Sequence, residues 1–243
     1  MKFVLVVVAG PAENYIEKCL ESIISQDRDD WVASVVLDRV GDKTVKKAYA
    51  YAGDKIRIHV NDKRMLACHN RKLAIDLIDM DDEDIIVIID GDDWFSCDHV
   101  LSFLYEQYNG TNTLLTHGSF ISHPYRGKEK KNKKYDAKDF KNLRKNTWHC
   151  SHLLTMKYKL WKHVEDESLR DKNGNYYDMA SDLALMIPAL EMAGLERVKF
   201  IPEILLVYNR ESAYSDSKVN RKNQIAMANE IRAKKPYQYK EVL

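Results

Sequence analysis

Residues 84–95 read DIIVIIDGDDWF, in which a five-residue apolar run is followed at once by aspartates. The apolar run, 85–89, predicts a strand that is buried on both faces of a sheet. Three carboxylates come directly after it, at Asp90, Asp92 and Asp93. Like charges this close repel one another, and a buried carboxylate without a partner is costly. We therefore expect a cation beside this turn.

The segments before this stretch alternate between strand-like and helix-like patterns. The predicted strands are 2–9, 31–38, 55–60 and 84–90. The predicted helices are 14–25, 44–51 and 65–79, the first with Asn14 as its cap. This alternation predicts an α/β fold with a mainly parallel, doubly wound central sheet flanked by helices. Ligands bind beyond the carboxyl ends of the strands in such sheets, and Asp38 and Asp90 both stand at predicted carboxyl ends.

The second half of the sequence is less regular. It predicts helices at 98–108, 180–194 and 221–234 and strands at 113–116 and 204–209. The segment 180–194 predicts a strongly amphipathic helix; Gly194 closes it and Pro188 should kink it. No internal repeat and no linker-like segment interrupts the chain, so we expect one domain over 1–243.

Composition places the chain among soluble globular proteins, because 45% of its residues are hydrophobic and 31% are charged. We see no signal peptide and no apolar stretch long enough to span a bilayer. The four cysteines form no CxxC pair, which argues against structural zinc and fits reduced thiols in a cytosol. The expected location is therefore cytoplasmic.

Positive charge is concentrated in one segment, Arg126 to Lys145, which holds ten basic and three acidic residues. Such a run is typical of a solvated loop, here with one turn of helix at most. The same segment could bind a polyanion or phosphate groups through its positive charge. The sequence leaves both interpretations open.

The Asp-x-Asp pair at Asp90 and Asp92 carries the clearest chemistry. Carboxylate oxygens suit Mg²⁺ or Mn²⁺, and Mg²⁺ in proteins is held by one or two carboxylates together with substrate phosphates. The sequence contains neither GxxxxGK[ST] nor GxGxxG. A P-loop NTPase and a Rossmann dehydrogenase are therefore both disfavoured.

Five blocks in a fixed order resemble a known family. They are VVVAGPAENYIEKCLESI, VVLDRVGDKT, ACHNRKLAID, IIDGDDWF and SDLALMIPALEMAG. Together they resemble a family 2 glycosyltransferase of the GT-A fold, over roughly residues 1–210. The resemblance implies a nucleotide-sugar-binding half at 1–95 and an acceptor-binding half with the C-terminal helix at 96–243.

The resemblance also implies roles for particular residues. Asp90 would face the nucleotide and, with Asp92, hold the Mn²⁺ or Mg²⁺ on the diphosphate. Asp38 would contact the base ring, and Asn70, in the block that matches the family's Ala-Arg-Asn, would lie on the donor side. Asp182 would be the catalytic base that accepts a proton from the acceptor hydroxyl.

The function implied is metal-dependent, inverting sugar transfer from a nucleoside diphosphate sugar, of the UDP-sugar class, to an acceptor hydroxyl. A carboxylate-held cation would neutralise the leaving diphosphate, and a carboxylate base would activate the acceptor. Three alternatives stay open: transfer to an anionic polymer such as nucleic acid, a nucleotidyltransferase of similar build, and a nucleic-acid-binding module. The basic segment lacks the interleaved aromatic residues that the binding module needs.

A structural role for Asp182 competes with catalysis. An acid in the first turn of a helix is favoured by the helix dipole, with Ser181 as the cap in that interpretation. Asp178, one helical turn upstream, is the alternative base.

Five other polar residues have two interpretations each. Arg71 is either a helix-surface arginine or a phosphate ligand. His149 and His152 have a poor spacing for a shared metal, so a hydrogen bond is the simpler expectation, with substrate contact as the alternative. Tyr208 and Arg210 either line a closing loop or pack at a strand end.

Overall fold

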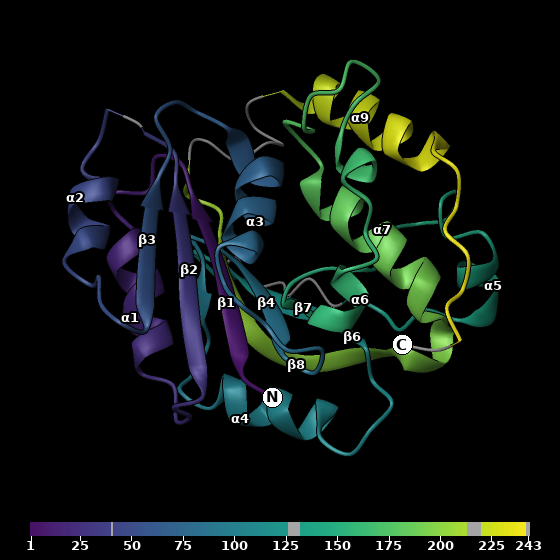
Figure 1. The fold of residues 1–243 in the computed structure, drawn as a ribbon, viewed down its shortest axis with the longest axis horizontal. Helices are drawn as coiled ribbons and strands as arrows, with labels where there is room; N and C mark the ends of the chain where they lie inside the picture. The colour runs from purple at the N-terminus through teal and green to yellow at the C-terminus, as the bar shows by residue number, and fades with distance from the viewer. Residues whose placement is uncertain (40, 126–131, 213–219, 242–243) are drawn as a thin grey trace.

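An eight-stranded sheet runs through the computed structural model, in the order β3-β2-β1-β4-β7-β6-β8-β5 (Figure 1). The structure describes residues 1–39, 41–125, 132–212 and 220–241. The strands are β1 Phe3–Ala9, β2 Trp31–Leu37, β3 Ile56–Val60, β4 Ile85–Asp90, β5 Trp94–Phe95, β6 Leu115–His123, β7 Leu154–Lys157 and β8 Val198–Asn209. The first four in spatial order are parallel, β7 and β5 are antiparallel to their neighbours, and β6 pairs with β8 in parallel.

Helices cover both faces of this sheet (Figure 1). They are α1 Ile16–Ile24, α2 Thr44–Tyr49, α3 Leu66–Asp76, α4 Val100–Tyr108, α5 Ala137–Lys141, α6 Tyr158–Trp161, α7 Ser181–Ala193 and α9 Arg221–Ala233. Two short 3₁₀ turns, Asp166–Leu169 and Leu195–Arg197, flank α7. Within the described part of the chain, no helix is both long and apolar enough to cross a membrane.

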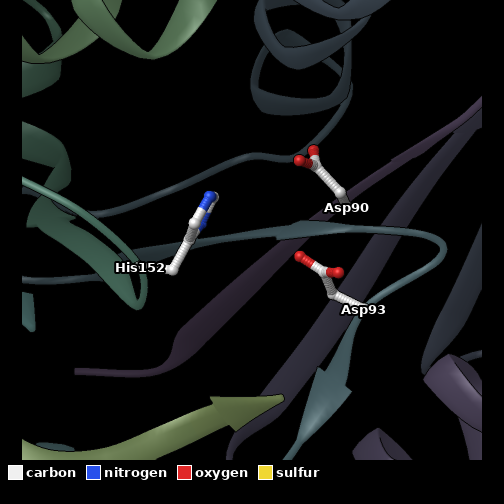
Figure 2. A group of neighbouring side chains, drawn as sticks. All are labelled: Asp90, Asp93 and His152. Carbon is white, nitrogen blue, oxygen red and sulfur yellow. The ribbon is translucent and has the colours of Figure 1, made fainter. Parts of the chain in front are cut away.

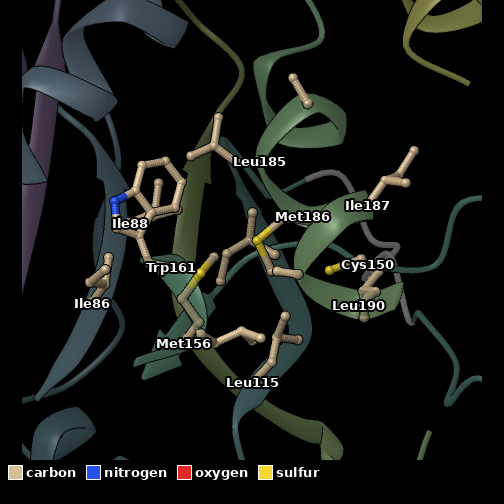
Figure 3. Close-up of a cluster of buried hydrophobic side chains, with 14 of the residues drawn as sticks. Ile86, Ile88, Leu115, Cys150, Met156, Trp161, Leu185, Met186, Ile187 and Leu190 are labelled. Carbon is tan, nitrogen blue, oxygen red and sulfur yellow. The ribbon is translucent and has the colours of Figure 1, made fainter. Parts of the chain in front are cut away.

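The central strands are buried on both sides. Alternate residues of β1 enter two different cores: Val4, Val6 and Val8 pack with α3 and α7, whereas Phe3, Leu5 and Val7 pack with α1 and α4. Figure 3 shows the first core, where side chains of β4, β6 and β7 meet those of α7. Each fully buried aliphatic side chain contributes about 1.5–3 kcal/mol relative to exposure. Because helices pack on both faces of this mainly parallel sheet, the expected doubly wound α/β architecture is confirmed.

Several local expectations were wrong in detail. Tyr15, not Asn14, precedes α1, and no side chain caps that helix. The strand expected at 113–116 begins at Leu115 and runs to His123, and β8 begins six residues before the expected strand. The antiparallel strand β7 was not expected at all. By contrast, Gly194 does end α7, with a φ of 72° that suits glycine.

His117 on β6 is buried within the fold, and we expect it to make stability depend on pH. Burial lowers the pKa of His117 to about 4, so between pH 6.5 and about 4 the unfolded chain binds a proton that the folded chain does not. Stability is therefore fully present above pH 6.5 and decreases as pH falls. The expected loss from this residue is about 2 kcal/mol between pH 8 and pH 5, measured by urea unfolding.

The matched variants are His117→Leu and His59→Leu. The first should flatten the pH dependence, whatever its effect on absolute stability. His59 is an exposed strand histidine on β3, so its replacement should leave the pH dependence as in the wild type. Equal slopes in His117→Leu and the wild-type chain would contradict the prediction.

Candidate functional site

A cavity of about 600 Å³ opens where the carboxyl ends of β1, β2, β4 and β8 meet the starts of α3 and α7. Its walls include all five predicted site residues: Asp38, Asn70, Asp90, Asp92 and Asp182. They come from four separate elements or element ends, and the parallel strands bring them to one edge of the sheet, as the doubly wound topology requires.

The acidic turn after β4 is held tightly against β1. The Gly91 N–H donates to the Val8 carbonyl at 2.8 Å, and the Asp93 N–H donates to the Asp90 carbonyl at 2.9 Å. A Cβ at position 91 would lie 2.6 Å from the Cβ of Ala9. Glycine between the two acids is therefore required by packing, and the turn fixes the directions of the neighbouring carboxylates.

Asp90 is paired with a buried arginine. The Nη2 of Arg71, on α3, donates to Asp90 Oδ1 at 2.5 Å, and the Arg71 side chain is only 5% exposed. Burial alone would raise the pKa of Asp90, but the charges of Arg71 and His152, together with the hydrogen bond from Arg71, outweigh this and hold the pKa below its usual range. The expectation of a helix-surface arginine was wrong. Arg71 lies inside the fold and keeps Asp90 ionised.

Asp93, which sequence reasoning left without a role, is buried beside two other carboxylates. It is 1% exposed, and burial, together with the charges of Asp92 and Asp90, raises its pKa well above the usual range. Its Oδ1 accepts a hydrogen bond from the Asn209 N–H at 2.8 Å. Among the described residues, no donor reaches its Oδ2. A cation at this place would relieve the crowding of negative charge.

A third possible ligand comes from a distant segment. Ligand atoms of Asp90, Asp93 and His152 all lie within 4.8 Å of one another, and Figure 2 shows the two carboxylates and the imidazole facing a common space. His149 lies elsewhere, its ring 5.3 Å from that of Tyr135. Sequence spacing alone missed the proximity of His152 to the acids.

Asp38 and Asn70 form a buried hydrogen-bonded network at the end of β2. The Asp38 carboxylate accepts from Nδ2 of Asn61 and Asn70, each at 3.0 Å, and from the N–H groups of Met65 and Leu66 at 2.8 and 3.1 Å. Burial raises its pKa, but these hydrogen bonds outweigh that effect and hold the pKa below the usual range. Asp38 therefore stays ionised and anchors the start of α3 at the cavity wall.

Asp182 lies half-buried in the first turn of α7, facing the cavity. Ser181 is not the cap of this helix, because Ala180 occupies that position and no side chain caps it. Instead, the Ser181 Oγ accepts a hydrogen bond from Nη1 of Arg71 at 2.5 Å. One guanidinium thus connects the acid at the end of β4 with the helix that carries Asp182.

The remaining wall of the cavity is polar and aromatic. Tyr208 stacks on His152 with ring centroids 5.6 Å apart, and both line the cavity together with Arg210. Asp178 also lines it, held by Nδ2 of Asn223 at 3.3 Å from each carboxylate oxygen. Sequence reasoning did not identify Arg64 and Gln224, which complete the wall; single polar residues on helices and loops carry no distinguishing pattern.

Comparisons with known proteins identify the family and the fold. The sequence matches the family described as glycosyl transferase family 2 over residues 4–162. The fold is similar to Staphylococcus aureus TarS 1-349 in complex with UDP-GlcNAc, at a TM-score of 0.66 and 17% identity, covering 88% of this chain and 62% of the other. A comparison with curated protein sequences finds no match.

Two further structures share the fold. One is the mannosyltransferase PcManGT from Pyrobaculum calidifontis in complex with GDP-Man and Mn²⁺, at TM-score 0.59 and 18% identity, covering 85% of this chain and 56% of the other. The second is glucosyl-3-phosphoglycerate synthase from Mycobacterium tuberculosis in complex with UDP, at TM-score 0.59 and 14% identity, covering 95% of this chain and 80% of the other. The chain spans 37% to 62% of the TarS chains it matches. It belongs to glycosyl transferase family 2 and has the GT-A fold of these glycosyltransferases.

Proposed function

We propose that this chain is a metal-dependent, inverting glycosyltransferase that moves a sugar from a nucleoside diphosphate sugar, of the UDP-sugar class, to an acceptor hydroxyl. The observation that carries the proposal is the convergence of Asp38, Asn70, Asp90, Asp92 and Asp182 on one cavity. A cavity of about 600 Å³ is within the range of small-molecule sites. In this proposal the half at 1–95 binds the donor and the half at 96–243 binds the acceptor.

The charge of the cavity supports a cation in the site. Five aspartates and three arginines line it: Asp38, Asp90, Asp92, Asp178, Asp182, Arg64, Arg71 and Arg210. A diphosphate would add further negative charge to this excess of carboxylates, which is unfavourable without a divalent ion. The oxygens of Asp90, Asp92 and Asp93 suit Mg²⁺ or Mn²⁺, and the imidazole of His152 favours Mn²⁺ over Mg²⁺. When bound, such an ion neutralises the charge that develops on the leaving diphosphate.

The protein's own residues then have separate tasks. Asp90 and Asp92 would hold the ion beside the donor's diphosphate, and the Asp38–Asn70 network forms the wall beside the base ring. Asp182 accepts the proton of the acceptor hydroxyl as that oxygen attacks the sugar carbon, while the nucleoside diphosphate departs from the opposite face. A single displacement of this kind inverts the configuration at the sugar carbon.

Donor screening tests the proposal. Purified chain with Mn²⁺ should release a nucleoside diphosphate from one class of nucleotide-sugar, UDP-sugars first, and Asp54→Asn, an exposed acid outside the cavity, should behave as the wild type. Release of inorganic pyrophosphate from a nucleoside triphosphate and a sugar phosphate would instead assign a nucleotidyltransferase. No diphosphate release from any donor would contradict the proposal.

The basic segment gives a prediction about the acceptor. Residues 126–131 of the predicted contact lie outside the described residues. In the described part, Arg144 is bound to Glu191 at 2.6 and 2.8 Å and is therefore structural, whereas Lys134, Lys138 and Lys141 are exposed. If the acceptor is anionic, reversing these three lysines to glutamate should raise the acceptor KM about 10-fold and flatten its salt dependence, with donor KM unchanged.

A matched reversal elsewhere separates a local contact from overall charge. Lys46, Lys55 and Lys199 are also exposed and do not line the cavity. Their reversal changes the net charge equally and should leave acceptor KM within about 2-fold of the wild type. Equal effects of the two triple variants, or no effect of either, would assign Lys134, Lys138 and Lys141 to a solvated surface.

A further inference from the structure

The first turn of α7 begins in an unusual way. Ala180, which precedes it, has a φ of 56°, in the left-handed region that residues with a Cβ rarely adopt. No side chain caps the helix, so its first N–H groups lack the usual support. Such a backbone persists only where the surroundings hold it. Contacts from outside the helix must therefore hold the turn that carries Asp182.

Arg71 supplies that contact. Its Nη1 donates to Ser181 Oγ and its Nη2 donates to Asp90 Oδ1, both at 2.5 Å. The side chain is 5% exposed, so solvent does not compete for these bonds. Two hydrogen bonds and one charge thus join α3, the end of β4 and the start of α7.

We propose that Arg71 is a positioning residue that fixes Asp182 relative to the donor-side carboxylate Asp90. Only the roles of Asp90 and Asp182 in it rest on the proposed function. A planar guanidinium suits this task because its two Nη atoms reach two acceptors in a fixed geometry, whereas the ammonium of lysine is a single point of charge. Both Nη atoms donate to acceptors of the protein, so Arg71 acts through its neighbours Ser181 and Asp90.

Arg71→Lys tests the positioning role, because it keeps the positive charge beside Asp90 but cannot also hold Ser181. We expect kcat to fall about 10-fold or more, since small displacements of a catalytic group are costly, while donor Kd stays within about 2-fold. Ser181→Ala should lower kcat as well. Combined with Arg71→Lys it should cost nothing further, because that bond is already lost. Additive losses, or a donor Kd that weakens as much as kcat falls, would overturn the proposal.

Hydrogen exchange gives a second measurement that does not need activity. The N–H groups of Leu183 and Ala184 bond to the Ala180 carbonyl at 3.1 and 3.3 Å. Their exchange should speed up in Arg71→Lys and in Ser181→Ala, while the last turn of α7 stays as protected as in the wild type.

The control is Lys72→Met, the next residue of α3, whose Nζ binds Asp76. It should leave the exchange of α7 unchanged. Wild-type exchange in both test variants would overturn the positioning role even if the chain transfers sugar. Faster exchange in a chain that transfers no sugar would support the positioning role and overturn the proposed function alone.

Discussion

Asp92→Asn is expected to lower sugar transfer by about 10³-fold, because a divalent ion at a developing phosphate charge supplies several kcal/mol. Asp92 is only half-buried at the wall of the cavity, so the thermal midpoint should change little. Removing divalent ions with EDTA should have the same effect on the wild-type chain, and added Mn²⁺ should restore it. Wild-type turnover of Asp92→Asn, or of the chain in excess EDTA, would contradict the metal role.

Asp93→Asn distinguishes two ligand sets for the same ion. The Asp-x-Asp motif points to Asp90 and Asp92, whereas the geometry brings Asp90, Asp93 and His152 together. Asparagine at position 93 can still accept the hydrogen bond from the Asn209 N–H. It removes a buried carboxyl group whose pKa is raised by burial and by the neighbouring acids. Without metal, the variant should therefore be at least as stable as the wild type.

The response to metal should be opposite. Mn²⁺ raises the melting temperature of a protein that binds it only when folded, and this increase should be much smaller in Asp93→Asn than in the wild type. His152→Phe, which keeps a ring beside Tyr208, should also reduce the increase. An unchanged Mn²⁺ response in both variants would leave Asp90 and Asp92 as the ligands.

The sequence predicted the part of the fold that depends on local pattern. The apolar runs that form β1 and β4 are long, continuous and ended by Gly or Asp, so their burial on both faces followed directly. β7 has only four residues, and its pairing with β4 depends on residues about seventy positions apart. β6 carries the buried polar residues Thr116, His117 and Ser119. Their burial depends on tertiary neighbours that no window of sequence reveals.

The same distinction applies to the site. Asp38 and Asp90 were located because they end strands, and the carboxyl ends of parallel strands share one edge. The proximity of His152 to Asp90 was not predictable, since the two are 62 positions apart and no periodic pattern relates them. Arg71 was expected on a surface because arginines are rarely buried without a partner. Its partners, Asp90 and Ser181, come from other elements.

Asp182→Asn is expected to reduce kcat about 10²-fold or more, because an amide cannot accept the proton of the acceptor hydroxyl. Donor affinity in the presence of Mn²⁺, measured by isothermal titration, should stay at the wild-type value, since Asp182 lies on α7 and not on the acidic turn after β4. A purely structural role would give the opposite result: a stability loss of about 0.3–1 kcal/mol from the helix dipole, with turnover nearly intact.

Glu17→Gln is the matched control for Asp182→Asn, because Glu17 is also a first-turn acid, on α1, and does not line the cavity. Glu17 shares the dipole effect but has no part in the chemistry. Its replacement should lower the free energy of unfolding by a few tenths of a kcal/mol and leave turnover unchanged. Intact turnover in Asp182→Asn would transfer the role of base to Asp178, which lines the same cavity and is held by Asn223. In that case Asp178→Asn should show the loss of kcat with unchanged donor binding, because the acceptor hydroxyl still needs one carboxylate to take its proton.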